Sequence, residues 1–357
     1  MDPRPTRWPA LLFLLLLTLL PARPPTLAAG RPGEARRAAV ASGPCVERAE
    51  PVMGDVLSIA AASRGGVTDT SRVAAALDLA FGEARRLAVV FAPDDAGSEL
   101  AGMNRAAADR RVGCSAELYG VLEAALALAG ESEGAYDPTT GPLLRAWDRR
   151  RDSRAPEPGE LSTARLLVGW RMLQLDPAVR TVRFLRSGME VTPGAVARGA
   201  LLERVAQVLR GRGIVRARLE LGGDVFAYTN HEAWTAAVTD PSGPGRTAIT
   251  LALSNAAAAT ARTGLEGSAR VLDPRTGQPP MGEASVTVVE RSALRARAVA
   301  EALLVRGRES AEAYARDHPA TGVLWLEPFD GGVRAWAWNL GRLQPEPDAR
   351  VEWMTRP

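Results

Sequence analysis

Three glycine-containing loops hold the polar side chains best placed to take part in chemistry. Asp137-Pro-Thr-Thr-Gly141 is the first, Gly222-Gly223-Asp224 follows a predicted strand, and Asp273-Pro-Arg-Thr-Gly277 is the third. Taken singly, each sequence is typical of a tight turn, because Gly accepts a positive φ and Asp caps its own turn. The loops alone therefore indicate structure more strongly than function, and their order along the chain has to be considered.

Arginine is the only strongly basic residue type in this chain. The sequence has 357 residues, and its 44 Lys plus Arg residues are all Arg, against 41 Asp plus Glu. Acidic residues are interspersed throughout, so the net charge of +3 indicates neither a nucleic-acid-binding nor a membrane-binding protein. With 46% hydrophobic and 24% charged residues, the composition is that of a globular protein.

Cysteine and histidine are too scarce for several kinds of catalytic centre. Cys45 and Cys114 allow one disulfide at most and no ordinary cysteine-based zinc site. His231 and His318 lie near no nucleophile motif. A catalytic triad or a zincin-type metal site is therefore not expected.

The N-terminus has the pattern of a secretory signal. Two arginines precede an apolar run, Ala10 to Leu20, which is about half as long as the roughly 20 residues of a membrane-spanning helix. We expect a signal peptide over 1–29, with an uncleaved anchor as the alternative, and a flexible lead-in over 30–44. The mature protein is then periplasmic or in the cell envelope, at most peripheral to the membrane, where a Cys45–Cys114 disulfide is permitted.

Strand and helix patterns alternate along the mature chain and favour an α+β, mixed α/β fold. Helices are predicted over 73–89, from Ser115 to about Leu126, from Pro193 to about Leu209, over 293–305 and over 309–317. Strands are predicted over 52–59, 181–185, 189–191, 217–221, 234–238, 248–253, 285–289, 322–326 and 333–338. Residues 133–147 and 148–159 are predicted as loops.

The order of the loops and of the segments between them resembles the ApbE family, the FAD:protein FMN transferases of the bacterial cell envelope. The similarity covers about three quarters of the chain, and we place its domain at 45–345, followed by a C-terminal tail over 346–357. The matching segments are Met53-Gly54, Ser98-Glu99-Leu100 to Asn104, Ala135 to Trp147, Met189 to Gly199, Gly222-Gly223-Asp224, Leu272 to Gly277 and Ala296 to Gly307.

The resemblance implies two α/β parts around a flavin cleft and a reaction assisted by Mg²⁺. In that reaction the diphosphate of FAD is split, AMP leaves, and FMN is joined to a Thr or Ser hydroxyl in the flavinylation motif of a partner protein. Such chemistry needs donors around a diphosphate, a cation for the developing charge and apolar faces for the flavin ring. The family's flavin and diphosphate contacts fall on Met53, Ala135, Tyr136, Asp137, Thr192, Arg198 and Leu272. Its catalytic positions fall on Arg198, Arg270 and Asp273.

The sequence departs from the family mainly at the chemical positions. Thr192 stands where the family has Asp, Arg198 where it has Lys, and Arg270 where it has His. The metal-binding helix differs most, because Arg297 and Glu301 stand where the family has Asp and Thr ligands. A guanidinium cannot coordinate Mg²⁺, which takes oxygen ligands.

Three accounts of the altered helix remain open. Arg297 and Glu301 are four residues apart on one helix face, so they could form an ion pair with no ligand role. The Arg297 guanidinium could instead hold phosphate in place of Mg²⁺, together with Arg198 and Arg270. In the third account Glu301 supplies a carboxylate that, with the backbone carbonyl of Ala195, restores a weaker metal site.

Two functions therefore compete at this stage. The first is transfer of FMN from FAD to a protein hydroxyl. The second is binding of FAD or another nucleotide by a relative that has lost the transfer reaction. The substituted residues Thr192, Arg270, Arg297 and Glu301 are the feature that separates them.

Overall fold

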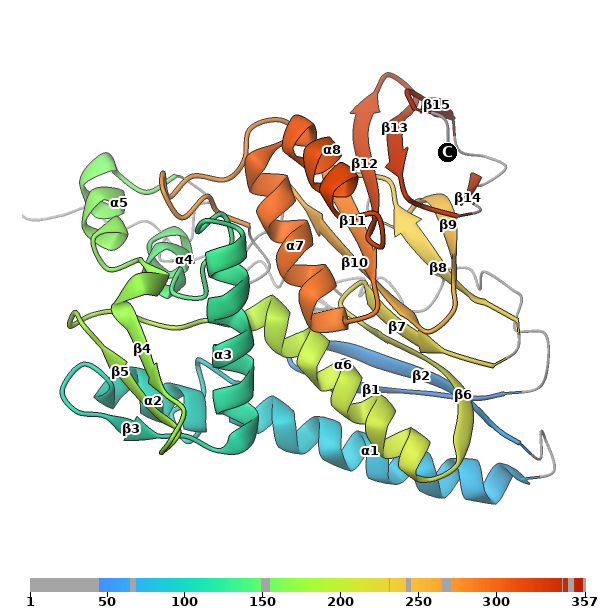
Figure 1. The fold of residues 1–357 in the computed structure, drawn as a ribbon, viewed down its shortest axis with the longest axis horizontal. Coiled ribbons are helices and arrows are strands. Elements are labelled where there is room, and N and C mark those ends of the chain that lie inside the picture. The colour runs from blue at the N-terminus through green and yellow to red at the C-terminus, as the bar shows by residue number, and fades with distance from the viewer. Residues whose placement is uncertain are drawn as a thin grey trace, which may run out of the picture. The chain divides into compact units, whose positions relative to one another are not determined.

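A nine-stranded sheet forms the centre of the fold (Figure 1). The computed structural model describes residues 45–64, 69–148, 155–230, 232–241, 245–264, 271–341, 343–345 and 350–355. All neighbouring strands of the sheet are antiparallel except β13 and β15, which are parallel. In sheet order the strands are β1 (Val46–Val52), β2 (Asp55–Ser63), β6 (Ile214–Leu221), β7 (Asp224–Tyr228), β10 (Ala256–Arg262), β11 (Ser285–Glu290), β12 (Gly322–Phe329), β13 (Gly332–Trp338) and β15 (Val351–Trp353).

Alternate side chains of this sheet enter two different cores. On β2, Leu57, Ile59 and Ala61 join a large core, whereas Ala60 joins a smaller core on the opposite face. The large core is closed by α1 (Thr70–Val90), α6 (Gly194–Gly211), α7 (Ala293–Arg306) and α8 (Arg308–Asp317). The smaller core is closed by a three-stranded sheet in the order β14 (Leu343–Pro345), β9 (Thr247–Leu253) and β8 (Trp234–Thr239).

The chain between α1 and α6 forms a second, smaller part that shares the large core. Leu100, Leu118, Leu122 and Val182 of this part are buried in the same cluster as the side chains of the central sheet. Its elements are α2 (Glu99–Ala106), β3 (Val112–Gly113), α3 (Ala116–Glu131), α4 (Gly141–Asp148), α5 (Pro158–Arg165), the 3₁₀ turn η2 (Trp170–Met172), β4 (Leu173–Asp176) and β5 (Thr181–Phe184). The strands pair in the order β3-β5-β4.

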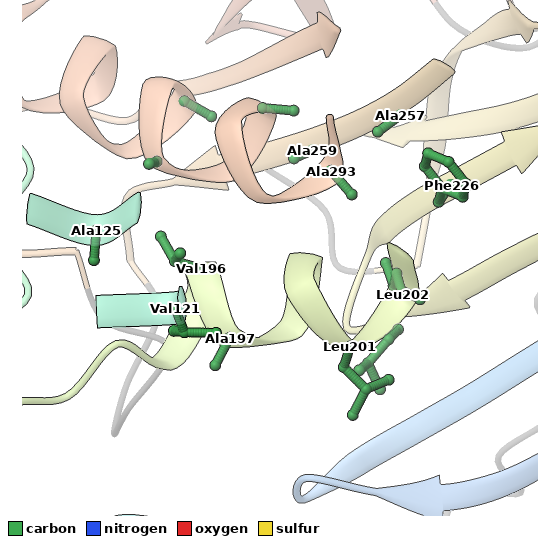
Figure 2. Close-up of a cluster of buried hydrophobic side chains, with 14 of the residues drawn as sticks. Val121, Ala125, Val196, Ala197, Leu201, Leu202, Phe226, Ala257, Ala259 and Ala293 are labelled. Atoms are coloured by element: carbon green, nitrogen blue, oxygen red, sulfur yellow. The ribbon is translucent and has the colours of Figure 1, made fainter. Parts of the chain in front are cut away.

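Helices α6 and α7 approach each other closely over the central sheet. Figure 2 shows Val196 and Leu201 of α6 in the same cluster as Ala293 of α7 and Ala257 of β10. A Cβ atom added to Gly199 would lie 2.5 Å from the Leu294 Cα, so only glycine allows this helix contact. The contact matters for the site, because α6 and α7 carry two of its arginines.

Most predicted elements occur at the expected places. The helices beginning at Ser115 and ending at Gly307 have the expected caps, because the Ser115 Oγ accepts from the Leu118 N at 3.2 Å and Gly307 has a φ of 88°. All five predicted helices are present within a few residues of their predicted bounds, as α1, α3, α6, α7 and α8.

Three of the predicted strands and loops differ from the structure. Met53 and Gly54, predicted inside a strand, instead form the two-residue turn between β1 and β2, with φ values of 53° and 76°. Residues 189–191 are not a strand, because the Asn104 side chain occupies both backbone groups of Val191. The Val191 N donates to the Asn104 Oδ1 and the Asn104 Nδ2 donates to the Val191 carbonyl, each at 2.9 Å. The predicted loop over 133–147 contains α4, whose second residue is the helix-compatible Pro142.

Two further expectations need correction. Residues 351–353 form β15 at the edge of the central sheet, so the expected tail after residue 345 contributes a strand to the domain. Cys45 and Cys114 are free thiols and do not form the permitted disulfide. Cys45 packs on the smaller core and Cys114 on the large one, on opposite faces of the sheet.

Residues 1–44 and His231 lie outside the described residues, so the predicted signal peptide and lead-in remain predictions. None of the helices in the described ranges combines the length and the apolar character needed to cross a bilayer.

Candidate active site

Arg297 connects α7 to the central sheet from a buried position. Its Nη1 donates to the Asp224 Oδ1 on β7 at 3.3 Å and to the Thr260 carbonyl on β10 at 2.7 Å. Its Nε and Nη2 both donate to the Glu301 Oε1 at 3.2 Å. Arg297 is only 2% exposed and Asp224 1%. Two carboxylates therefore compensate a guanidinium that has been removed from water.

The charge environment keeps Arg297 protonated. Burial by itself lowers the pKa of Arg297, but the charges of Asp224 and Glu301 raise it by more, so that it lies above its ordinary value. The guanidinium is thus a permanent positive charge inside the protein.

Arg198 of α6 approaches the same carboxylate from the other side. Its Nε lies 3.8 Å from the Asp224 Oδ2, and neither atom has a hydrogen-bond partner among the described residues. Burial and the charge of Arg297 lower the pKa of Arg198. We call Arg198, Asp224, Arg297 and Glu301 the arginine–carboxylate cluster. The Arg198 Nε and the Asp224 Oδ2 thus form an ion pair without a hydrogen bond.

The Gly222-Gly223 turn makes room for this cluster. Gly222 has a φ of 59°, and a Cβ atom there would lie 2.8 Å from the Asp55 Oδ2 and 3.5 Å from the Arg198 Nε. Asp55 immediately follows the Met53-Gly54 turn, so the hairpin turns β1–β2 and β6–β7 meet at this end of the sheet.

Tyr136 belongs to the smaller part of the molecule and lies near Glu301 of the cluster. It is 5% exposed, and its Oη has no hydrogen-bond partner among the described residues. Burial, followed by the charges of Glu301 and Asp137, raises the pKa of Tyr136 well above its ordinary value. The hydroxyl is therefore a neutral donor close to Glu301. Ala135, beside it, is buried in the large core.

Asp137 organises its own loop. Its Oδ1 accepts from the Thr139 N at 2.8 Å and the Thr139 Oγ1 at 2.6 Å, and its Oδ2 accepts from the Trp170 N at 2.9 Å. Burial raises the pKa of Asp137, and the hydrogen bonds from Thr139 and Trp170 oppose that shift. The carboxylate that the family resemblance places at the flavin is thus already engaged in holding two loops together.

A hollow of about 700 Å³ opens beside this loop. Its lining includes three arginines, Arg165, Arg171 and Arg275, together with Trp170. The Arg171 guanidinium lies 4.2 Å from the centre of the Trp170 ring. The volume is within the usual range for small-molecule sites, and the lining combines positive charge with an aromatic face.

The Asp273 turn forms the opposite wall through Pro274 and Arg275. The Asp273 Oδ1 accepts from the Arg275 N at 2.9 Å and the Arg275 Nε at 3.1 Å. The Trp147 Nε1 fixes the turn from α4 by donating to the Gly277 carbonyl at 2.9 Å. Leu272 packs in a small apolar cluster with Leu143 and Leu161. Arg270, predicted to be catalytic, lies outside the described residues.

Thr192 lies just before α6, in a separate hollow. Its N donates to the Pro138 carbonyl at 2.8 Å, and its buried Oγ1 has no partner among the described residues. The hollow has a volume of about 290 Å³ and is also lined by the ion-paired Arg145 and Glu190. The backbone of Ala195 lies in the first turn of α6.

A family model matches the part of the chain that forms this site. The model of the ApbE family matches residues 53–325, which include the hairpin turns, the Asp137 loop, the Asp273 turn and α7. This chain belongs to the ApbE family. The resemblance inferred from the motifs is thereby confirmed.

Similar proteins of the ApbE family cover nearly the same length. The FAD:protein FMN transferase of Treponema pallidum is 28% identical over 324 residues, which is 83% of this chain and 88% of the relative. The Vibrio cholerae enzyme of the same name is 26% identical over 303 residues, 80% of this chain and 89% of the relative.

Solved ApbE structures share the fold. The flavin transferase ApbE from V. cholerae has a TM-score of 0.71 at 26% identity and covers 82% of this chain and 97% of its own. The ApbE protein from Thermotoga maritima has a TM-score of 0.69 at 24% identity, with 79% and 94% covered. The expected α+β fold of the ApbE flavin transferases is confirmed.

The residues at the family's metal position in this ApbE chain do not fit Mg²⁺. The ion pair between Arg297 and Glu301 that the first account predicts is present. Within the described ranges, no group of three or more His, Cys, Asp or Glu side chains could hold a metal ion. A cation about 4 Å from the Arg297 guanidinium would be repelled by about 4 kcal/mol per unit charge, at an effective dielectric constant near 20.

The motifs led to some of these residues and missed others. Tyr136, Arg198, Arg297 and Glu301 were chosen by position, and the structure brings all four to one place. The role of Asp224 as counter-ion was missed, although its Gly-Gly-Asp turn was a signal. Arg165 and Arg171 were also missed, because nothing in their sequence spacing links them to the Asp273 turn.

Proposed function

We propose that this ApbE-family protein is an FAD:protein FMN transferase. Relatives from T. pallidum and V. cholerae carry that name. The observation that carries the proposal is the arginine-lined hollow between the Asp137 loop and the Asp273 turn. Its Arg165, Arg171 and Arg275 side chains suit the oxygens of a diphosphate, and Trp170 offers a face to an aromatic ring. FAD combines both groups in one molecule.

The reaction exchanges one phosphoanhydride bond for one phosphoester bond. The oxygen of a Thr or Ser hydroxyl attacks the phosphorus of the FMN half of FAD. AMP leaves with the electron pair of the broken P–O bond, and the hydroxyl proton passes to the leaving phosphate or to water. Fixed positive charges lower the barrier, because negative charge develops on the phosphoryl oxygens. Arginine remains charged throughout the physiological pH range.

The proposal assigns roles to the residues around the hollow and the cluster. The family resemblance assigns the flavin side of FAD to Met53, Ala135, Tyr136 and Leu272, which lie outside the lining of the hollow. The family resemblance also assigns FAD contacts to Arg198, which lies in the arginine–carboxylate cluster, and to Thr192, which lines a separate hollow. Asp273 and Arg270, which follow and precede Leu272 in the sequence, are assigned to the transfer step. Asp137 holds the loop that carries Tyr136.

Covalent labelling of an acceptor tests the proposal. The mature protein is incubated with FAD and an acceptor that carries a Thr or Ser flavinylation motif, and in-gel flavin fluorescence and AMP release are measured. We expect both signals in equal amounts. Arg171→Gln should weaken FAD binding by about tenfold, the effect of one lost charged contact. Arg316→Gln on α8, where the side chain is 70% exposed and outside the hollow, is the matched control.

The competing function gives a different result. A nucleotide-binding relative without transferase activity would bind FAD but label no acceptor and release no AMP. A chain that neither binds FAD nor labels the acceptor would contradict both functions.

Export is part of the proposal. The apolar run within residues 1–29 supports a cleaved signal peptide and an envelope location, with a partner protein as acceptor. N-terminal sequencing of protein from the periplasmic fraction should find a chain that begins close to residue 30. Full-length protein retained in the cytoplasm would contradict export.

A further inference from the structure

The arginine–carboxylate cluster already contains the positive charge that a divalent cation would bring. Four hydrogen bonds from Arg297 reach three acceptors, the Asp224 and Glu301 carboxylates and the Thr260 carbonyl. Arg198 adds a second guanidinium, and the charge of the nearby Asp55 adds a third carboxylate, so both buried arginines are compensated. Compensation of this kind is what makes buried guanidinium groups tolerable.

Three of the oxygens that could bind a metal here already accept from Arg297, and a fourth, the Asp224 Oδ2, lies 3.8 Å from the Arg198 Nε. Mg²⁺ binds oxygen ligands at about 2.1 Å. The Asp224 Oδ1, the Glu301 Oε1 and the Thr260 carbonyl each accept an N–H from the guanidinium at 2.7 to 3.3 Å. A metal ion held by any two of these atoms would lie against the guanidinium, and the like charges would repel.

Helix geometry holds the guanidinium in this place. Glu301 follows Arg297 by one helical turn on α7, where i and i+4 side chains meet. The Asp224 and Thr260 acceptors come from two strands of the central sheet, β7 and β10, which are direct neighbours. Because Arg297 is anchored from three elements, it cannot leave to admit a metal without breaking its ion pairs with the buried Asp224 and the partly buried Glu301.

We propose that the Arg297 guanidinium permanently occupies the cation position of this site, so that the protein binds FAD without a divalent metal ion. Arg297 acts as a positioning residue, because it is buried away from solvent and holds Asp224 and Glu301. Arg198, whose Nε has no hydrogen bond in the described part of the chain and lies 3.8 Å from the Asp224 Oδ2, is the second guanidinium of the site. The identity of the ligand as FAD rests on the proposed function, but the occupation of the cation position does not.

Titration with Mn²⁺ alone tests the cation position without FAD. Free Mn²⁺ is followed by electron paramagnetic resonance during addition to the mature protein. We expect no stoichiometric binding by the wild-type protein and one bound equivalent in Arg297→Gln, in which Glu301 loses its counter-ion and Asp224 keeps only the more distant Arg198. Mn²⁺ should also raise the melting temperature of Arg297→Gln and not that of the wild type.

Two further variants complete the test. Arg295→Gln is the matched control, since Arg295 lies on the same helix and pairs with Glu131 and Glu290 outside the cluster. It should bind no Mn²⁺. If Arg297→Gln does not fold, the double variant Arg297→Asp with Glu301→Thr is used. It replaces the guanidinium by a carboxylate and the Glu301 carboxylate by a hydroxyl, and it should also bind one equivalent of Mn²⁺. One equivalent bound by the wild-type protein overturns the proposal, and so does a folded variant of the cluster that gains none.

FAD titration separates this inference from the proposed function. Dissociation constants measured in EDTA and in Mg²⁺ should agree within about twofold. A loss of affinity of tenfold or more in EDTA overturns the inference. Absence of FAD binding in both buffers contradicts the proposed function, while the Mn²⁺ titration still decides whether the cation position is occupied.

Discussion

At the scale of single residues, the site is defined by charged and hydroxyl groups with polar atoms that have no hydrogen bond. The Arg198 Nε, the Asp224 Oδ2 and the Tyr136 Oη are all buried and unpartnered among the described residues. A buried polar group without a partner costs about 1–3 kcal/mol in stability. Several such groups close together are typical of a ligand-binding site, where the arrangement lowers the stability of the fold.

Tyr136→Phe is expected to change the stability of the fold and the affinity for FAD in opposite directions. Removal of the unpartnered hydroxyl should raise the free energy of unfolding by about 1 kcal/mol and weaken FAD binding by about tenfold. Urea unfolding and FAD titration measure the two effects.

Tyr228→Phe is the control for that change. The Tyr228 Oη donates to the Ile214 carbonyl at 3.3 Å, and the side chain is buried. Loss of this hydrogen bond should lower the free energy of unfolding by about 1 kcal/mol and leave FAD affinity unchanged. A Tyr136→Phe protein that is destabilised and binds FAD normally would show that the Tyr136 hydroxyl has no role toward a ligand.

At the scale of elements, the site depends on how α6 and α7 lie against the sheet. Gly199 allows the two helices to touch, and Glu203 of α6 accepts from the Ser292 Oγ at 2.7 Å and the Leu294 N at 3.2 Å. The start of α7 is therefore attached to α6. This attachment sets the relative positions of Arg198 and Arg297, one on each helix.

Gly199→Ala is expected to displace α7. The added Cβ meets Leu294 backbone atoms at 2.5 Å, so stability should fall by about 3 kcal/mol. Gly120→Ala on α3 is the matched control, because Gly120 is exposed with open space around its Cβ position. There alanine should raise stability by about 0.5–1 kcal/mol. Equal stabilities of the two variants in urea unfolding would show that α6 and α7 are not in close contact.

Glu83 links α1 to α6 and gives the fold a predictable response to acid. Hydrogen bonding from Arg86 lowers the pKa of Glu83 to about 2, with burial opposing the shift and Arg204 of α6 adding to it. Because the pKa is lower in the folded state than the ordinary 4.5, the stabilisation is complete above pH 4.5 and is lost as the pH falls towards 2.

Glu83→Gln should therefore lower stability at pH 7 by about 1 kcal/mol, since the partner arginines are partly exposed. The difference from wild type should vanish as the pH approaches 2. Urea unfolding at several pH values measures this difference in the free energy of unfolding. Glu123→Gln, at an exposed site of α3, is the control. A difference that stays constant between pH 7 and pH 2.5 would show that the charge of Glu83 does not contribute.

At the scale of the whole molecule, one core runs through both parts of the described chain. The cluster of buried side chains extends from Val52 to Trp325 and includes α2 and α3 as well as the central sheet. The two walls of the arginine-lined hollow, the Asp137 loop and the Asp273 turn, are therefore carried by a single cooperative unit.

Calorimetry of the mature protein should show one unfolding transition. The heat-capacity change should be about 4 kcal/mol/K, from the usual value per residue. FAD at a hundred times its dissociation constant should stabilise that one transition by about 2.7 kcal/mol. Two transitions, only one of which responds to FAD, would contradict a shared core.

The sequence by itself determined the family, the five longest helices and the identity of the altered positions Arg198, Arg297 and Glu301. These follow from local patterns, helical periodicity and motif order, which need no knowledge of contacts. Strands β7 and β10 were not predictable, because β7 is buried at every position and β10 is rich in alanine. Only the tertiary structure showed the ion pair between Arg297 and Glu301 that the first account of the altered helix predicts. The Asp224 carboxylate that pairs with Arg297 lies 73 residues away in the chain, and folding alone brings the two together.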